Sequence, residues 1–124
     1  MYDRIVVGFT KSASAREATQ HAAHLADALG AELHLVSAFS GEDSARADAE
    51  AALESYALHC ARPPKTHALP GDPADAILRV ATEVDADLVV VGNKGMQGAK
   101  RVLGSAPNTI SHKAPCAVLI VHTR

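Results

Sequence analysis

The chain has 124 residues, of which 48% are hydrophobic and only four are aromatic, and its formal net charge is −2. This length suits one domain, which we place over residues 1–124, and it allows a core that needs neither disulfides nor metals. The slight excess of negative charge disfavours nucleic acids and anionic membranes as partners, because proteins that bind either one usually carry an excess of basic residues.

The predicted elements begin with a strand. Ile5 to Val7 is a β-branched run that ends at Gly8, which is typical of a short strand buried on both faces. Ser14 and Glu17 have the spacing of a capping box, so we expect the first helix to begin around Ser14. Gly30 follows the apolar face of this helix and is expected to end it.

Strands and helices then alternate along the rest of the chain. In order, we expect a strand from Leu33 to Phe39, a helix between Asp43 and Cys60, a weak strand from Thr66 to Leu69, a helix capped by Asp72 ahead of Pro73, a strand from Leu88 to Val91, a helix from about Ala106 to Lys113 and a strand from Ala117 to Val121. This alternation predicts an α/β domain in which helices cover both faces of an open parallel sheet. In such sheets ligands bind beyond the carboxyl ends of the strands, where the strand order reverses. If the strands that end at Gly8 and Gly92 are neighbours, their loops meet at that point.

The cysteines and the hydropathy pattern indicate where the protein works. Cys60 and Cys116 are far apart and lack CxxC spacing, so we expect buried free thiols in a reducing compartment. The sequence opens without a signal-like pattern, and no apolar run reaches transmembrane length. We therefore expect a cytoplasmic protein that does not contact membranes.

The segment from Leu88 to Ser105, LVVVGNKGMQGAKRVLGS, offers the most chemistry. An apolar run is followed by glycines and by the cations Lys94, Lys100 and Arg101. Glycines let backbone N–H groups approach a ligand closely, and a helix that starts near Ser105 would present further N–H groups to an anion. The segment therefore indicates a ligand that carries phosphate.

Three stretches together resemble the universal stress protein (UspA-like) family over essentially the whole chain. They are the opening IVVGFTKSASAREA, the segment GDPADAILRVATEVDADLVVVGNKG and the close LGSAPNTISHKAPCAVLIVHTR. The resemblance implies a Rossmann-like five-stranded sheet in the order 3-2-1-4-5 and a homodimer formed through the C-terminal strand. For the nucleotide-binding branch of the family it further implies ATP or AMP as ligand, with cyclic AMP bound by some members.

That branch carries the motif G-x2-G-x9-G-[ST]. Gly92, Gly95, Gly104 and Ser105 match it here, with a spacer of eight residues in place of nine between the second and third glycines. The resemblance implies that Gly92 lies beside the ribose and that the other three residues bind phosphates. The acidic residue that the family usually has after the first strand is replaced by Thr10, so we expect Mg²⁺ binding to be weak or absent.

The resemblance and the strand ends together give the predicted nucleotide site. The base is expected between the ends of the first two strands, beside residues 36–38, in an aliphatic rather than an aromatic slot. The predicted binding residues are Gly8, Phe9, Thr10, Ser12, Ser37, Val91, Gly92, Asn93, Gly95, Gly104, Ser105, Ala106 and Pro107.

Several alternatives remain open. The sequence lacks the Walker A, G-x-G-x-x-G and G-x-S-x-G motifs, so we predict no catalytic residues and a stress-response regulator that binds without turnover and acts on an unknown protein partner. The main alternative is a nucleotide-free dimeric interaction module, whose glycines serve packing. A weaker one is a slow ATPase or autophosphorylating protein with Ser105 or Thr109 as acceptor. His21 and His24 have a metal-compatible i, i+3 spacing but are expected to face solvent, because no third ligand clearly completes a set.

Overall fold

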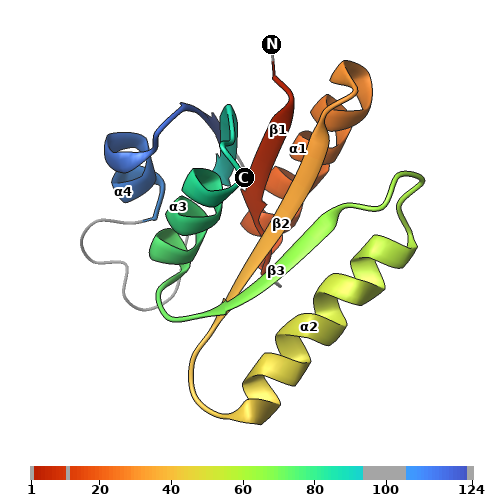
Figure 1. The fold of residues 1–124 in the computed structure, drawn as a ribbon, viewed down its shortest axis with the longest axis vertical. Coiled ribbons are helices and arrows are strands. Elements are labelled where there is room, and N and C mark those ends of the chain that lie inside the picture. The colour runs from red at the N-terminus through yellow and green to blue at the C-terminus, as the bar shows by residue number, and fades with distance from the viewer. Residues whose placement is uncertain (1, 11, 94–105, 123–124) are drawn as a thin grey trace.

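Parallel strands form one sheet in the order β3-β2-β1-β4-β5 in the computed structural model, which describes residues 2–10, 12–93 and 106–122 (Figure 1). The strands are β1 (Arg4–Gly8), β2 (Glu32–Phe39), β3 (Lys65–Pro70), β4 (Leu88–Gly92) and β5 (Ala117–Val121). β1 lies at the centre, because Val7 pairs with Leu35 of β2 on one side and with Val90 of β4 on the other. The expected fold class and strand order are confirmed.

Helices cover both faces of this sheet. They are α1 (Ala13–Leu29), α2 (Asp43–Leu58), α3 (Pro73–Glu83) and α4 (Ala106–Lys113). Ile5 and Val7 of β1 pack with residues of α1 and α2, whereas Val6, which points the other way, packs with residues of α3 and α4. The continuous β-branched runs therefore reflect a sheet that is buried on both sides, as the sequence predicted.

The start of α1 corrects the sequence prediction. Ser12, not Ser14, is the N-cap, and its Oγ accepts a hydrogen bond from the backbone N–H of Ala15 at 3.1 Å. Ser14 lies inside the first turn and is only 6% exposed. It is buried there because α1 packs closely against the end of β4 at Gly92, so tertiary packing decided between two serines that both suit a cap.

Two other predicted helix ends are confirmed. The Asp72 side chain accepts from the backbone N–H of Asp75 at 3.1 Å, and Pro73 follows it in the first turn of α3. Gly30 ends α1 in the left-handed conformation with a φ of 68°. Glycine suits this position because a Cβ strains a positive φ.

The cysteines are free but less enclosed than expected. Cys60 and Cys116 are both half-buried, and partial burial raises the pKa of each thiol. Neither thiol is therefore activated as a nucleophile. In the part of the chain that the structure describes, no helix has the length and apolar character needed to cross a membrane.

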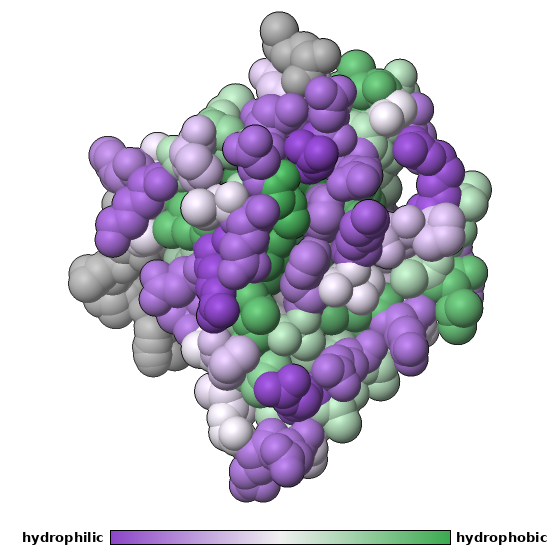
Figure 2. Space-filling view, viewed as in Figure 1, coloured by the Kyte–Doolittle hydropathy of each residue, from purple (hydrophilic) through white to green (hydrophobic). Residues whose placement is uncertain are grey.

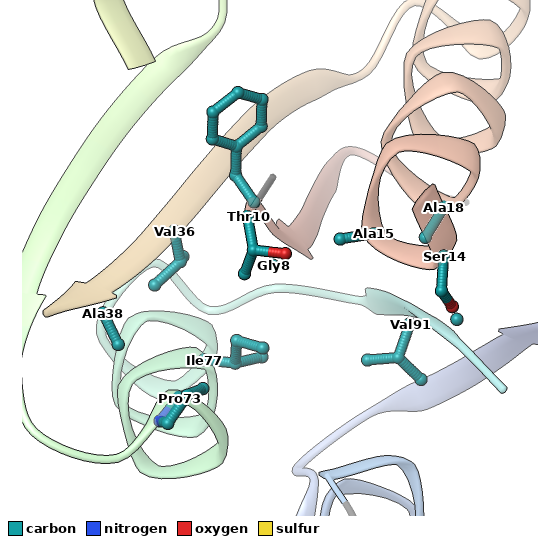
Figure 3. A pocket seen from close by; sticks show the side chains of 12 residues that line it. Gly8, Thr10, Ser14, Ala15, Ala18, Val36, Ala38, Pro73, Ile77 and Val91 are labelled. Atoms are coloured by element: carbon teal, nitrogen blue, oxygen red, sulfur yellow. The ribbon is translucent and has the colours of Figure 1, made fainter. Parts of the chain in front are cut away.

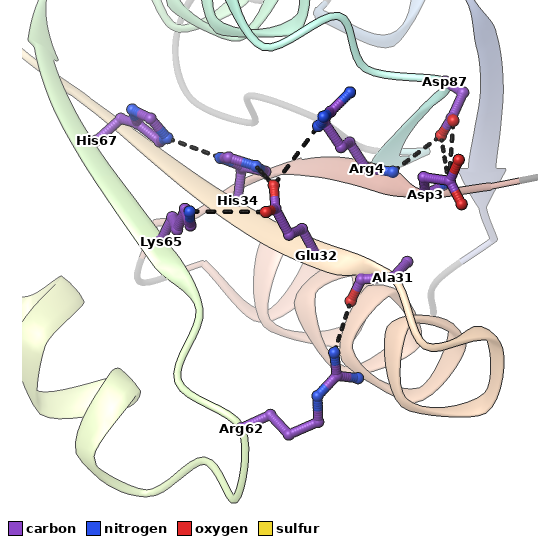
Figure 4. Close-up of polar contacts among 9 residues, drawn as sticks. All are labelled: Asp3, Arg4, Ala31, Glu32, His34, Arg62, Lys65, His67 and Asp87. Carbon is purple, nitrogen blue, oxygen red and sulfur yellow. Dashed lines mark hydrogen bonds and ion pairs between the residues drawn. The ribbon is translucent and has the colours of Figure 1, made fainter.

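A polar cluster lies on the α3 side of the sheet, where β1, β2 and β3 begin (Figure 4). His34 is only 3% exposed, and its two ring nitrogens contact His67 Nε2 and Glu32 Oε1, each at 3.0 Å. The Glu32 carboxylate also lies 3.6 Å from Arg4 and 3.6 Å from Lys65. This arrangement brings together two histidines that are 33 positions apart in the chain.

His67 makes stability depend on pH. Burial lowers its pKa below the ordinary value of 6.5, and the charges of His34 and Lys65 act in the same direction, whereas Glu83 opposes them. Because the unfolded chain then binds the proton more readily, stability falls as the pH drops through 6.5 towards the lower folded pKa. We expect urea unfolding to give a smaller loss of stability between neutral pH and mildly acidic pH for His67→Gln than for the unmodified chain. Equal losses in the two proteins would contradict this assignment.

Candidate functional site

The carboxyl ends of β1 and β4 lie side by side and form the floor of a pocket. These strands pair in parallel with Val6 opposite Val89 and Val7 opposite Val90, which establishes the adjacency that the sequence analysis had to assume. Because β1 leads to β2 on one side and has β4 on the other, the strand order reverses at this point. The pocket that opens here is lined by Gly8, Phe9, Thr10, Ser14, Ala15, Ala18, Val36, Ala38, Pro73, Ile77, Val91 and Gly92.

The pocket is small and its walls are largely aliphatic. Figure 3 shows Val36, Ala38 and Ile77 on one side of it and the first turns of α1 on the other. The cavity has a volume of about 60 Å³, whereas complete small-molecule sites span roughly 300–1,000 Å³. The lining residues therefore do not enclose a nucleotide by themselves.

Some of the predicted binding residues line this wall, and others do not. Gly8, Phe9, Thr10, Val91 and Gly92 are among the lining residues. Ser37 is not, because side chains alternate along β2 and those of Val36 and Ala38 occupy the pocket side. The backbone N–H of Asn93 donates to the carbonyl of Val121 at 2.8 Å.

The remaining predicted residues are only partly described. Gly95, Gly104 and Ser105 lie outside the described residues, as do Lys94, Lys100 and Arg101. Ala106 and Pro107 belong to the first turn of α4, and their side chains are not described. The roles of these residues stay predictions.

Thr10, which lines the pocket, is hydrogen-bonded to Ser12, which is a predicted binding residue but not a lining residue. The Thr10 hydroxyl donates to Ser12 Oγ at 3.1 Å, and the backbone N–H of Ser12 donates to Thr10 Oγ1 at 3.1 Å. Ser12 Oγ thus accepts both from Thr10 and from Ala15. Its own O–H can donate towards an incoming anion without breaking the cap of α1.

The two glycines that end β1 and β4 differ in how closely other atoms approach them. A Cβ on Gly92 would lie 2.9 Å from the backbone carbonyl oxygen of Ser14 and would also collide with its Oγ. A Cβ on Gly8 would lie 2.7 Å from Cδ1 of Ile77. Close approach of the α1 backbone therefore explains Gly92 whether or not a ligand binds, whereas the contact at Gly8 involves only the flexible end of a side chain.

Sequence reasoning missed several lining residues. Ser14, Ala15 and Ala18 come from the first turns of α1, while Pro73 and Ile77 come from the start of α3. The start of each helix follows a strand in sequence, so both starts lie at the carboxyl edge of the sheet. That rule was available from the sequence, but the predicted binding residues did not include these five positions.

Neither the charges nor the histidines build a metal centre in the described residues. Within residues 2–10, 12–93 and 106–122 there is no group of three or more His, Cys, Asp or Glu side chains placed to hold a metal ion. His21 and His24 are exposed on α1, as expected for solvent-facing residues. The described lining of the pocket offers hydroxyl groups, backbone groups, aliphatic side chains and the ring of Phe9.

Comparison with known proteins gives the family. The model of the Universal stress protein family matches residues 1–122. The chain belongs to the universal stress protein family. It is 37% identical to Universal stress protein Rv1636 of Mycobacterium tuberculosis over an alignment that covers 98% of this chain and 97% of that protein. It is 30% identical to Universal stress protein A homolog 1 of Coxiella burnetii, with 97% of this chain and 96% of that protein covered.

Solved structures of other universal stress proteins are similar to this chain over nearly its whole length. One, in complex with cAMP, superposes with a TM-score of 0.80 at 30% identity and covers 99% of each chain. Another, from Archaeoglobus fulgidus in complex with dAMP, has a TM-score of 0.76 at 26% identity and covers 96% of this chain and 97% of that one. Both ligands are adenine nucleotides, so nucleotide binding occurs within the family on this fold.

Proposed function

We propose that this universal stress protein binds an adenine nucleotide at the carboxyl ends of β1 and β4 and acts in the cytoplasm as a regulatory homodimer without turning the nucleotide over. The observation that carries the proposal is the position of the pocket, where the strand order reverses beside the glycine-rich segment that starts at Gly92. Relatives solved with cAMP and dAMP support the ligand class. ATP and AMP lead among the candidates, with cyclic AMP as the third.

In this proposal the two sides of the pocket contact different parts of the nucleotide. Val36, Ala38 and Ile77 offer an aliphatic slot for the base, in keeping with the scarcity of aromatic residues. The ribose and phosphates then lie beyond this wall, where Gly92, the Ser12 hydroxyl and the backbone N–H groups of the following segment supply donors. The described pocket contains no carboxylate among its lining residues, so the proposal includes weak or absent dependence on Mg²⁺.

Regulation is proposed to act through conformation. Bound phosphates would order the segment from Gly92 to Ser105 and change a surface that an unknown protein partner reads. A ligand can shift such an equilibrium only if it binds one state more tightly than the other. The partner is therefore expected to bind with different affinities to the empty and the nucleotide-loaded protein.

The proposed dimer uses β5. This strand is at the edge of the sheet and pairs with β4 on one side. Its Leu119 and Ile120 side chains are 37% and 45% exposed, although apolar side chains on an edge strand normally need cover. Pairing of β5 with the same strand of a second copy would provide that cover.

The alternative, a nucleotide-free interaction module, has one specific observation in its favour. Gly92, which the sequence analysis assigned to the ligand, is accounted for by packing against the backbone of Ser14. This alternative predicts that the purified protein carries no nucleotide and does not bind added nucleotide.

Mass spectrometry of the denatured, purified protein tests the proposal against this alternative. We expect an adenine nucleotide to be released, and we expect ATP or AMP to raise the melting temperature of protein stripped of its ligand. The variant Gly95→Val should lose this shift because a branched side chain blocks close approach to the backbone. Neither a released nucleotide nor a melting shift from ATP, AMP or cyclic AMP would favour the interaction module. Sustained phosphate release from ATP would instead favour the slow ATPase.

A further inference from the structure

A second and larger cavity lies at the opposite edge of the sheet. Its volume is about 300 Å³, which reaches the lower end of the range for small-molecule sites of roughly 300–1,000 Å³. Figure 2 shows the molecule hollowed between the start of β2 and the connection from α2 to β3, with hydrophilic residues along much of the rim. The cavity is lined by Ala23, Ala26, Asp27, Ala31, Glu32, Leu33, Tyr56, His59, Cys60, Ala61, Arg62, Pro63 and Lys65.

Arg62 bridges the two sides of this cavity. From the connection after α2, its guanidinium reaches across to α1 and donates to the carbonyl oxygens of Ala26 at 3.3 Å and Ala31 at 3.4 Å. It also lies 3.9 Å from the carboxylate of Asp27. Figure 4 shows the Arg62 side chain extended from the connection to the backbone at Ala31. The two sides of the cavity are thus joined across the gap, so the cavity is preformed.

The charges around the cavity are compensated by one another. Arg62 is matched by Asp27, and Lys65 lies 3.6 Å from the carboxylate of Glu32. A charged ligand would find no unmatched opposite charge among these four side chains, because each already has an opposite charge beside it. Burial also raises the pKa of the Tyr56 phenol and of the Cys60 thiol, so both stay neutral near pH 7. The surroundings therefore favour an uncharged ligand.

The lining combines an apolar surface with an aromatic ring and, at the exposed His59, a hydrogen-bond acceptor. Methyl groups of alanines from α1 and the side chain of Leu33 supply the apolar surface. The Tyr56 ring, which is held by the ring of Phe9 at a centroid distance of 5.4 Å, supplies an aromatic contact. His59 Nδ1 lies 2.8 Å from the carbonyl oxygen of Ser55, and since a carbonyl can only accept, Nδ1 carries the proton. In neutral His59 the other nitrogen, Nε2, is then an acceptor.

We propose that this cavity is a second binding site, for a small uncharged aromatic molecule that carries one hydrogen-bond donor, the chemical class of indole and phenol. The proposal does not rest on nucleotide binding, because this cavity and the pocket at Gly8 and Gly92 have no lining residue in common. Indole suits the test as a probe because it has an aromatic body, no charge and a single N–H donor.

The cysteines provide a readout that is specific for the site. Cys60 lines the cavity and Cys116 does not, and both are half-buried. We expect millimolar indole to slow the alkylation of Cys60 severalfold and to leave the rate of alkylation at Cys116 unchanged. Peptide mass spectrometry measures both rates. Indole-3-carboxylate and tryptamine, which add a negative and a positive charge to the same ring, should protect Cys60 much less.

A matched pair of α1 variants completes the experiment. Ala23→Leu should fill the cavity and abolish protection, whereas Ala28→Leu, at an exposed position of the same helix, should keep it. Unprotected Cys60 in the unmodified chain, equal slowing at both cysteines, or equal protection by the charged analogues would overturn the proposal. The comparison among indole and its analogues holds even if Ala23→Leu fails to fold.

Discussion

Replacing Gly92 with alanine is expected to lower the free energy of unfolding by about 2 kcal/mol, a typical cost of overpacking. The new Cβ would lie 2.9 Å from the carbonyl oxygen and 3.3 Å from the carbonyl carbon of Ser14. Because these atoms belong to the backbone of α1, the helix has to move away from β4 to make room. Urea unfolding, read from the midpoint at unchanged slope, measures the loss.

Gly8→Ala is the matched control for this experiment. Its Cβ meets only Cδ1 and Cγ1 of Ile77, the flexible end of a side chain, at 2.7 and 3.6 Å. A change of rotamer costs about 0.5–1.5 kcal/mol, and loss of glycine freedom in the unfolded chain returns about 0.4–1 kcal/mol. We therefore expect Gly8→Ala to be close to neutral, and equal destabilisation by the two variants would contradict the packing described at Gly92.

Replacing Ala38 with phenylalanine should weaken adenine nucleotide binding by about tenfold or more, a loss of at least about 1.4 kcal/mol. Ala38 lines the aliphatic wall beside Val36 and Ile77, and the cavity there has only about 60 Å³. A phenyl ring would occupy the space that the proposal gives to the base. Calorimetric titration with AMP measures the change.

Ala47→Phe controls for the chemistry of that substitution. Ala47 is exposed on α2 and does not line the pocket, so the variant should bind AMP as the unmodified chain does. If Ala38→Phe keeps its fold and binds AMP with unchanged affinity, the base does not lie against this wall. Parallel circular dichroism spectra of both variants establish that the fold is kept.

The sheet could be predicted from the sequence because each strand depends on local patterns that packing then reinforced. The β-branched run at 5–7 and the apolar run at 88–91 could hardly be anything but buried strands, and both are. The cap at Asp72 could be predicted for the same reason, since the proline after it fixes the helix start.

The start of α1 shows the limit of local reasoning. Ser12 and Ser14 are both good caps by residue type, and Ser14 has the better sequence spacing with Glu17. The outcome was decided by the contact of Ser14 with Gly92, almost eighty positions away in the chain. No local pattern contains that contact.

The candidate site was predictable in its location but not in its composition. Strand ends placed Gly8, Thr10 and Gly92 correctly at one edge of the sheet. The direction of side chains on β2 was not fixed by the sequence, because the strand is buried on both faces and lacks an alternating pattern. The prediction put the base beside residues 36–38 but named only Ser37 as a binding residue, whereas Val36 and Ala38 line the pocket.

In the proposed function, hydrogen-bond donors at the carboxyl edge of the sheet bind a phosphate. Calorimetric titration of nucleotide-free protein, with AMP and separately with adenosine, tests whether these donors do so. If they do, AMP binds at least about tenfold more tightly than adenosine, since a charge-assisted hydrogen bond contributes roughly 1.5–3 kcal/mol. Equal affinity for the two compounds, or no binding heat from AMP, ATP and cyclic AMP alike, would contradict the account.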